Sequence, residues 1–180
     1  MNKKIEFTKV YDVKSPVRAH DDDAGTDWFV PACTKEFVDD FLSKNEQNML
    51  TTRSDYDEKG RPVMLITIPP GEQVNIPSGI KVNILDKGTY LQAENKSGVA
   101  TKFHLITGAN IIDAGYRGMV HINLMNVGST YVTISTGQKI VQFIHKEYIG
   151  PEWSEITNEE YDNLESTARG EGGFGSTGTK

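Results

Sequence analysis

The sequence has 180 residues, of which 37% are hydrophobic and 24% are charged, and its formal net charge is −6. This length and composition fit one soluble domain with its own core, and the acidic balance argues against a general nucleic-acid surface. The single cysteine, Cys33, excludes an internal disulfide framework, and no apolar run reaches the roughly 18 residues of a membrane span. Because no apolar segment follows the basic start, we expect no signal peptide and a cytoplasmic protein.

Short segments that alternate between apolar and polar residues run through most of the chain. They lie at 5–10, 74–76, 80–84, 90–91, 120–124, 132–134 and 140–144, with turn signals at 77–79, 87–88, 126–129 and 135–137. Many short strands at close spacing with Gly and Pro turns are typical of a sandwich or barrel. The sequence therefore predicts an all-β fold.

Three stretches depart from this pattern. Lys35–Asn48 carries apolar residues at helical spacing, which predicts a short amphipathic helix. Thr51–Arg61 is polar and predicts a loop with a turn at 57–60. Residues 166–180 are rich in Gly, Ser and Thr, a composition that indicates a disordered end.

Two segments in the chain could bind a cation or a phosphate. In Ala24-Gly25-Thr26-Asp27, a carboxylate within a glycine-containing turn suits the shell of a hard cation such as magnesium, although a solvated acidic turn looks the same. Lys96-Ser97-Gly98 places a cation, a hydroxyl and a glycine amide next to one another. That set suits a phosphate oxygen, and a polar turn that opens a helix or strand is the alternative.

The segment Gly108–Gly118 is the most informative. Asp113 follows two β-branched apolar residues and precedes a tight Ala-Gly turn. A carboxylate at the end of a buried strand can orient a water molecule and accept its proton. Tyr116 offers a flat face for a sugar ring. The alternative is a β-hairpin with an ordinary turn aspartate.

Two later segments complete the set. After Gly137, Lys139 and Gln142 could donate to phosphate oxygens, although an edge strand would look alike. In the tail that starts at Arg169, glycines expose backbone N–H groups to an anion and Phe174 could stack on a base. Together the five segments supply the parts needed to hydrolyse a nucleoside triphosphate.

In this order the five segments resemble the five motifs of the trimeric dUTP pyrophosphatase family, from about Ala24 to Gly178. The most specific matches are Ile112–Gly118 and Arg169–Gly178. The resemblance implies magnesium-dependent hydrolysis of dUTP to dUMP and pyrophosphate, which keeps dUTP low and supplies dUMP for thymidylate synthesis. It also implies a jelly-roll-like, distorted β-barrel subunit over residues 1–165, a glycine-rich lid over 166–180, and a homotrimer whose sites combine segments from different subunits.

The resemblance implies a role for each matching residue. Asp113 would activate the water that attacks the α-phosphorus in line, and Tyr116 would pack under the deoxyribose. The backbone around Asn110, Ile112 and His121 would read uracil. The phosphates would be held by Lys96, Ser97, Gly98 and Gln142, and the lid would close through Arg169, Phe174 and Gly175. Asp27 would order the water shell of magnesium and pair with Lys139.

The chain departs from the family pattern in two respects. Lys96 and Lys139 stand where the second and fourth motifs usually carry arginine, and lysine lacks the bidentate fork of arginine. About 30 additional residues, from Cys33 to about Leu65, separate the first two motifs. An inert elaboration or a cover for a subunit edge is the favoured interpretation of this insertion, and a contact with a protein partner is the alternative.

Three other functions compete with this interpretation. A dCTP deaminase would carry a glutamate where Asn123 stands, would favour Trp at Tyr116, and would lack the full glycine-rich tail. A dUTP-sensing binding protein would use the insertion as its regulatory surface. A structural β-protein would carry the motifs by chance. A cellular and a viral origin both remain open, so the expected location is the cytoplasm of a cell or of a host.

Overall fold

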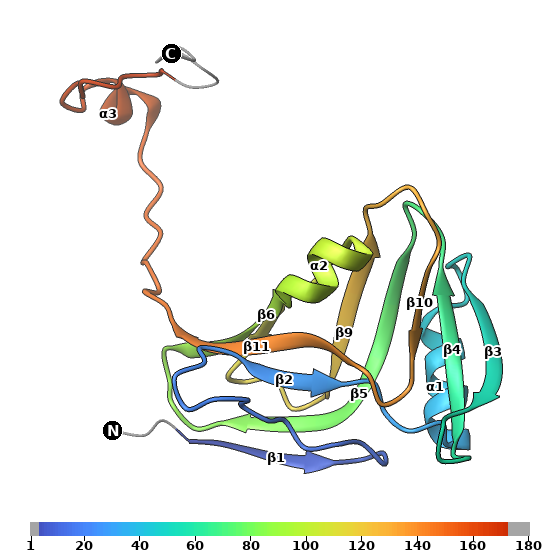
Figure 1. Ribbon diagram of the computed structural model, residues 1–180. Coiled ribbons are helices and arrows are strands. Elements are labelled where there is room, and N and C mark those ends of the chain that lie inside the picture. Colours follow the sequence, from blue (N-terminus) through green and yellow to red (C-terminus); the bar gives the residue numbers. More distant parts are fainter. Residues whose placement is uncertain (1–3, 173–180) are drawn as a thin grey trace. The chain divides into compact units, whose positions relative to one another are not determined.

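The computed structural model describes residues 4–172, and the body that ends at Ile149 is built from three antiparallel sheets (Figure 1). The first sheet contains β1 (Ile5–Lys9), β5 (Gln73–Ile84), β9 (Met119–Asn126) and β7 (Leu105–Thr107) in that order. The second contains β2 (Thr26–Phe29), β11 (Lys139–Glu147), β6 (Thr89–Asn95) and β8 (Ile111–Asp113). The third contains β10 (Val132–Ser135), β4 (Pro62–Ile68) and β3 (Thr51–Tyr56). The predicted all-β fold is confirmed.

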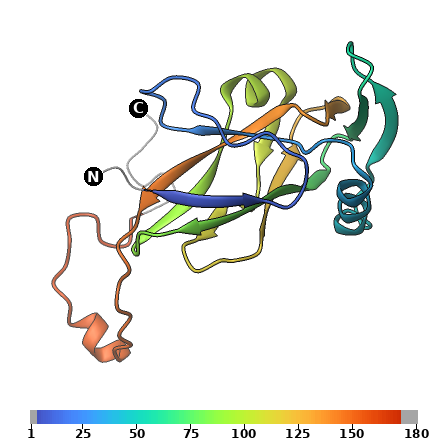
Figure 2. The ribbon, with the colours of Figure 1, turned by 90° about the horizontal axis from the view of Figure 1, so that it is seen from below.

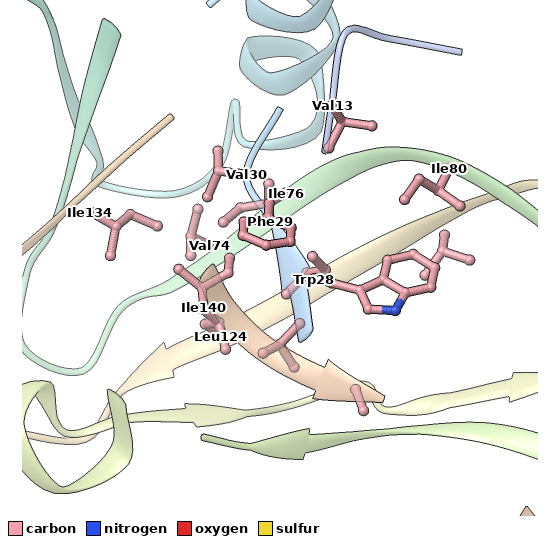
Figure 3. Close-up of a cluster of buried hydrophobic side chains, with 14 of the residues drawn as sticks. Val13, Trp28, Phe29, Val30, Val74, Ile76, Ile80, Leu124, Ile134 and Ile140 are labelled. Carbon is pink, nitrogen blue, oxygen red and sulfur yellow. The ribbon is translucent and has the colours of Figure 1, made fainter. Parts of the chain in front are cut away.

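The core lies between these sheets and is filled by the apolar positions that predicted the strands. In β9, Val120, Ile122 and Leu124 alternate with less buried residues and are each at most 1% exposed. Side chains from β2, β5, β9, β10 and β11 converge on this core in Figure 3. Alternation thus identified the strands because one face of each is packed against its neighbours.

The expected break at residues 77–79 is instead a bulge inside the single long strand β5. The register passes from Pro77 opposite His121 to Lys81 opposite Met119, so three residues of β5 face one residue of β9. Gly79 adopts a φ of +72°, and its carbonyl accepts a hydrogen bond from Val10 N at 2.8 Å. Pro and Gly therefore mark a bulge here rather than the end of a strand.

The predicted helix is present as α1 (Lys35–Lys44), four residues shorter at its end than expected. Thr34 caps its start by accepting a hydrogen bond from Phe37 N. At its end, the buried side chain of Asn45 donates to Asn75 O at 2.8 Å and accepts from Asn75 N at 2.9 Å. Asn45 thus ties the helix to β5, which is why the helix stops there.

The predicted loop at Thr51–Arg61 is wrong for its first half, because Thr51–Tyr56 forms β3. This strand pairs with β4 through a turn in which Asp57 O accepts from Gly60 N at 2.9 Å, so the expected turn is confirmed. All six residues of β3 are exposed. Since β3 is covered on neither face, its sequence carries no apolar alternation to reveal it. Figure 2 shows this hairpin and α1 at one end of the body.

The helix of the insertion packs into the hydrophobic core. Phe37 and Phe41 of α1 are 0% and 1% exposed, and Tyr11 packs edge-on against Phe37 with ring centroids 6.3 Å apart. The predicted end of the insertion, at about Leu65, falls inside β4, which is paired with β10. Only the β3 side of the hairpin extends away from the body.

We expect Phe41→Ala to lower the free energy of unfolding by about 3–5 kcal/mol, because it empties a fully buried aromatic site. Leu42→Ala on the exposed side of the same helix is the matched control and should change it by about 0.5 kcal/mol or less. Urea unfolding at one fixed protein concentration measures both. An unchanged midpoint for Phe41→Ala would mean that the helix is a loose addition.

The part of the chain that the structure describes contains two further helices. α2 (Ser97–Phe103) follows β6, and α3 (Asn158–Asp162) lies in a second unit that begins at Gly150. α3 starts with a capping box in which Thr157 and Glu160 bond reciprocally. None of the helices within residues 4–172 has the length and apolar character needed to cross a bilayer.

Candidate active site

A buried carboxylate between two lysines organises the first candidate site. Asp27 of β2 is 6% exposed, and its two carboxylate oxygens pair separately with Lys96 and with Lys139, the latter at 2.9 Å. Burial acts to raise the pKa of Asp27, but the hydrogen bonds and charges of the two lysines outweigh it and hold the pKa below its ordinary value. The expected contact with Lys139 is therefore present, and the contact with Lys96 adds to it.

An open pocket of about 580 Å³ surrounds this cluster. It gathers residues that are far apart in the sequence but belong to the first, second and fourth candidate segments. The polar lining residues are Asp23, Asp27, Lys96, Ser97, Lys102, Gln138, Lys139 and Gln142. Three lysines beside hydroxyl and amide donors make the pocket suitable for an anion with several oxygens, such as a polyphosphate.

A close approach of backbone and side chain shapes one wall of this pocket. A Cβ atom on Gly25 would lie 2.1 Å from Gln142 Oε1, so only glycine leaves room for that side chain. Gln142 Nε2 in turn donates to Asn95 O at 2.9 Å, which links β11 to the end of β6. No local pattern marks Gly25, because its close approach to Gln142 appears only in three dimensions.

The second candidate site is the turn that carries Asp113. The interpretation of Asp113 as the end of a buried strand is wrong for this chain, because Asp113 is exposed and its neighbour Ile111 is 50% exposed. β8 is a three-residue edge strand on β6, and Tyr116 N donates to Asp113 O at 3.0 Å to close a turn. The alternative of a β-hairpin is also wrong, because β8 pairs with β6 whereas β9 pairs with β5 and β7. Asp113 stands in an ordinary turn, which leaves its carboxylate accessible to a ligand.

Tyr116 is held firmly although it is 42% exposed. Its hydroxyl donates to Met119 O at 2.9 Å, and a Cβ on Gly118 would lie 2.3 Å from that hydroxyl. Arg117 Nη1 donates to Ala114 O at 2.7 Å and stiffens the same turn. The exposed ring is therefore presented in one orientation, as a platform for a flat or cyclic ligand group requires.

The residues expected to read a base have mostly structural contacts within this chain. The carbonyl of Asn110 accepts from Ala93 N at 2.8 Å, and Ile112 stands opposite Leu91 in the register of β8 with β6. His121 lies in β9 opposite Pro77. The carbonyl of Asn110 is thus already bonded to β6.

Asn123 supports the start of the connection from β7 to β9, which carries β8 and Tyr116. Its Oδ1 accepts from Ala109 N at 3.2 Å, and a Cβ on Gly108 would lie 1.9 Å from that oxygen. Its Nδ2 donates to Gln73 Oε1 at 3.3 Å. An amide that serves as a structural bridge stands where a deaminase would carry its glutamate, and this weakens the deaminase alternative.

The two candidate sites do not meet within one chain. Asp113 stands opposite Tyr90 at one end of β6, whereas Lys96 follows the other end of this strand. At about 3.3 Å per residue, those positions are separated by roughly 20 Å along the strand. The described residues that line the lysine pocket include none from 108–121.

The remaining expectations concern the tail and the metal. Arg169 Nε donates to Gly172 O at 2.8 Å within the second unit, and Phe174 and Gly175 lie outside the described residues. Within residues 4–172, no cluster of three or more His, Cys, Asp or Glu side chains could hold a metal. Both oxygens of Asp27 already pair with lysines, so neither is free to bind a metal ion directly.

Comparisons with known proteins place the chain. The dUTPase family model matches residues 64–178. A protein of Oryza sativa called deoxyuridine 5'-triphosphate nucleotidohydrolase is 36% identical over 113 residues, which cover 63% of each chain. A protein of the same name from Maricaulis maris is 42% identical over 118 residues, which cover 64% of this chain and 73% of that protein. A mutant dUTPase of Staphylococcus bacteriophage 80alpha with dUpNHpp superposes with a TM-score of 0.69 at 21% identity, over 99% of each chain. The chain belongs to the dUTPase family.

Proposed function

We propose that this protein hydrolyses dUTP to dUMP and pyrophosphate, keeping dUTP low and supplying dUMP for thymidylate synthesis. The observation that carries the proposal is the pocket in which Asp27 fixes Lys96 and Lys139 beside the Ser97-Gly98 turn. Such a pocket suits the phosphates of a nucleotide. Family membership and the names of the relatives narrow the nucleotide to dUTP. The cytoplasm of a cell or of a host remains the expected location.

The chemical step is assigned to Asp113, an exposed carboxylate on a stiff turn. It accepts the proton of a water molecule as that water attacks the α-phosphorus in line, and pyrophosphate leaves. Lys96, Ser97, Gly98 and Gln142 hold the phosphates, and Arg169, Phe174 and Gly175 belong to the lid. A bound magnesium ion would neutralise charge on the phosphates, and Asp27 would contact its water shell.

Selection of deoxyuridine is assigned to the connection from β7 to β9, which carries β8 and Tyr116. The ring of Tyr116, fixed by its bond to Met119 O, packs under the deoxyribose and leaves no space for a 2′-hydroxyl. Backbone groups around Asn110, Ile112 and His121 read the uracil edge. The carbonyl of Asn110 already accepts a hydrogen bond from Ala93 N. Asn110 would therefore contact uracil through its backbone N–H or its side chain.

A homotrimer with shared sites is the second part of the proposal. The roughly 20 Å along β6 between the position of Asp113 and that of Lys96 supports it, because a water near Asp113 cannot reach a phosphate held at Lys96 in the same chain. Placing the Asp113 turn of one subunit over the lysine pocket of another brings the two together. Cyclic symmetry then repeats the arrangement in every subunit.

The test is to mix the purified protein and magnesium with dUTP, dCTP, dTTP and UTP, and to follow pyrophosphate and the identity of the base. We expect rapid release of pyrophosphate from dUTP alone and loss of turnover when EDTA removes the metal. Deamination of dCTP would move the chain to the deaminase alternative. Binding of dUTP without any turnover would favour the sensing protein.

A contact between the insertion and a protein partner stays a prediction, now limited to the β3–β4 hairpin. The outer edge of β3 has no neighbouring strand among the described residues, and such an edge can pair with a strand of another protein. Deleting residues 33–65 would remove α1 from the core. A pull-down should therefore compare the intact chain with one in which only 52–60 is shortened to a tight turn.

A further inference from the structure

The carbonyl of Met119 accepts hydrogen bonds from two side chains. The hydroxyl of Tyr116 donates to it at 2.9 Å, and Nδ1 of His121 lies 3.0 Å from the same oxygen. A carbonyl oxygen can only accept, so Nδ1 of His121 carries the hydrogen. One backbone oxygen thus joins the exposed tyrosine ring to a half-buried histidine.

The other ring nitrogen of His121 is held away from water. Nε2 is buried and has no hydrogen-bond partner among the described residues. Burial lowers the pKa of His121 below its ordinary value, so the ring is neutral at pH 7 and keeps its one hydrogen on Nδ1. The bond to Met119 O is therefore the one hydrogen bond through which this imidazole is fixed.

The two hydrogen bonds to the Met119 carbonyl lie where the regular pairing of the sheet is interrupted. The bulge in β5 lies at this point, with the register jumping between Pro77 opposite His121 and Lys81 opposite Met119. Proline has no N–H to donate to a ladder, and a bulge interrupts the regular spacing of the ladder bonds. Side-chain bonds from Tyr116 and His121 hold the Met119 carbonyl where the sheet itself is irregular.

The insertion reaches the same histidine. Asp40 and Lys44 of α1 act on the charge of His121 in opposite senses, Asp40 raising its pKa and Lys44 lowering it. Asp40 also accepts a hydrogen bond from Tyr11 Oη at 2.8 Å, and burial followed by this contact raises the pKa of Tyr11 to about 12. Tyr11 thus keeps its proton at neutral pH and bonds to α1 through Asp40.

We propose that His121 is a positioning residue that sets the discrimination between dUTP and UTP by holding the Met119 carbonyl to which Tyr116 bonds. The inference rests on the proposed role of Tyr116 as the platform under the deoxyribose. Rejection of a 2′-hydroxyl requires that the ring cannot move aside by the width of one atom. When His121 no longer holds the carbonyl, the Tyr116 ring gains that freedom and UTP is admitted.

Two substitutions separate the contact from the size of the side chain. His121→Asn places an amide N–H close to the position of Nδ1 and should keep the contact, whereas His121→Gln places its amide near Nε2 and should lose it. A neutral hydrogen bond corresponds to about a twofold to tenfold change in equilibrium. The ratio of kcat/KM for dUTP to that for UTP should fall by about this factor in His121→Gln and return in His121→Asn.

Tyr116→Phe gives a second path to the same result, because it removes the other bond to Met119 O. Its ratio should fall similarly, and combining it with His121→Gln should add little. Ratios within twofold of the wild type in both His121→Gln and Tyr116→Phe would overturn the proposal. NMR signals of labelled tyrosine rings should change for Tyr116 in His121→Gln and not in His121→Asn. Because this readout needs no substrate, it tests the contact even if dUTP is not hydrolysed.

Discussion

Replacing Asp113 by Asn should lower kcat for dUTP by about 10²- to 10⁴-fold, the range in which a positioned general base contributes to catalysis. The amide keeps the size of the side chain but cannot accept the proton of the attacking water. Since Asp113 is exposed, the change should leave folding intact. Single-turnover release of pyrophosphate measures the chemical step without the contribution of product release.

Two controls accompany this substitution. Asp39→Asn alters another exposed carboxylate, on the outer face of α1, and should leave kcat unchanged. A non-hydrolysable dUTP analogue should bind to Asp113→Asn about as tightly as to the wild type, because phosphate and uracil contacts lie elsewhere. Turnover within tenfold of the wild type would remove Asp113 from the role of base and would require another acceptor near the α-phosphorus.

Most of the fold could be predicted because most strands have one buried face. β9 could be predicted because Val120, Ile122 and Leu124 alternate with polar residues and are each packed in the core. β3 did not, because both of its faces are exposed and its residues carry no pattern. The turn predicted at Pro77 and Gly79 is wrong for a related reason. A sequence marks where regular pairing is disturbed, but the partner strand decides whether the disturbance is a turn or a bulge.

The candidate site was predictable as separate parts but not as an assembly. Asp27, Lys96 and Asp113 each stood out through local chemistry. The pairing of Lys96 with Asp27 depends on how β2, β11 and β6 are ordered in the sheet, and no local pattern encodes that order. The separation of Asp113 from Lys96 depends on the register of β8 on β6. Distances of this kind follow from strand pairing and therefore require the structure.

The same assembly explains how lysine can replace arginine at both positions. Each lysine is a point charge that binds one oxygen of Asp27, whereas the fork of one arginine takes both oxygens of a carboxylate. Two lysines can thus share Asp27, and the carboxylate fixes their ammonium groups side by side. Lys96 and Lys139 are therefore best regarded as one coupled unit rather than as two independent substitutions.

Two inactive variants should restore activity to each other if the site is shared between subunits. Lys96→Met removes the phosphate contact and Asp113→Asn removes the base, so each should be nearly inactive alone. In trimers formed at random from equal amounts, about a quarter of the sites would combine an intact Lys96 from one subunit with an intact Asp113 from another. Activity is measured in this unselected mixture, and two different tags on the variants show that mixed trimers have formed.

The decisive control mixes the wild type with the double variant Lys96→Met/Asp113→Asn in equal amounts. A site contained in one chain would leave half of the sites active in this mixture and none in the mixture of single variants. A site built from two subunits predicts about a quarter in both mixtures, because the origin of each residue then no longer matters. The roughly 20 Å that β6 places between the positions of Asp113 and Lys96 is the reason why we expect the second result. Activity confined to the control mixture would mean that the chain folds back on itself to join them.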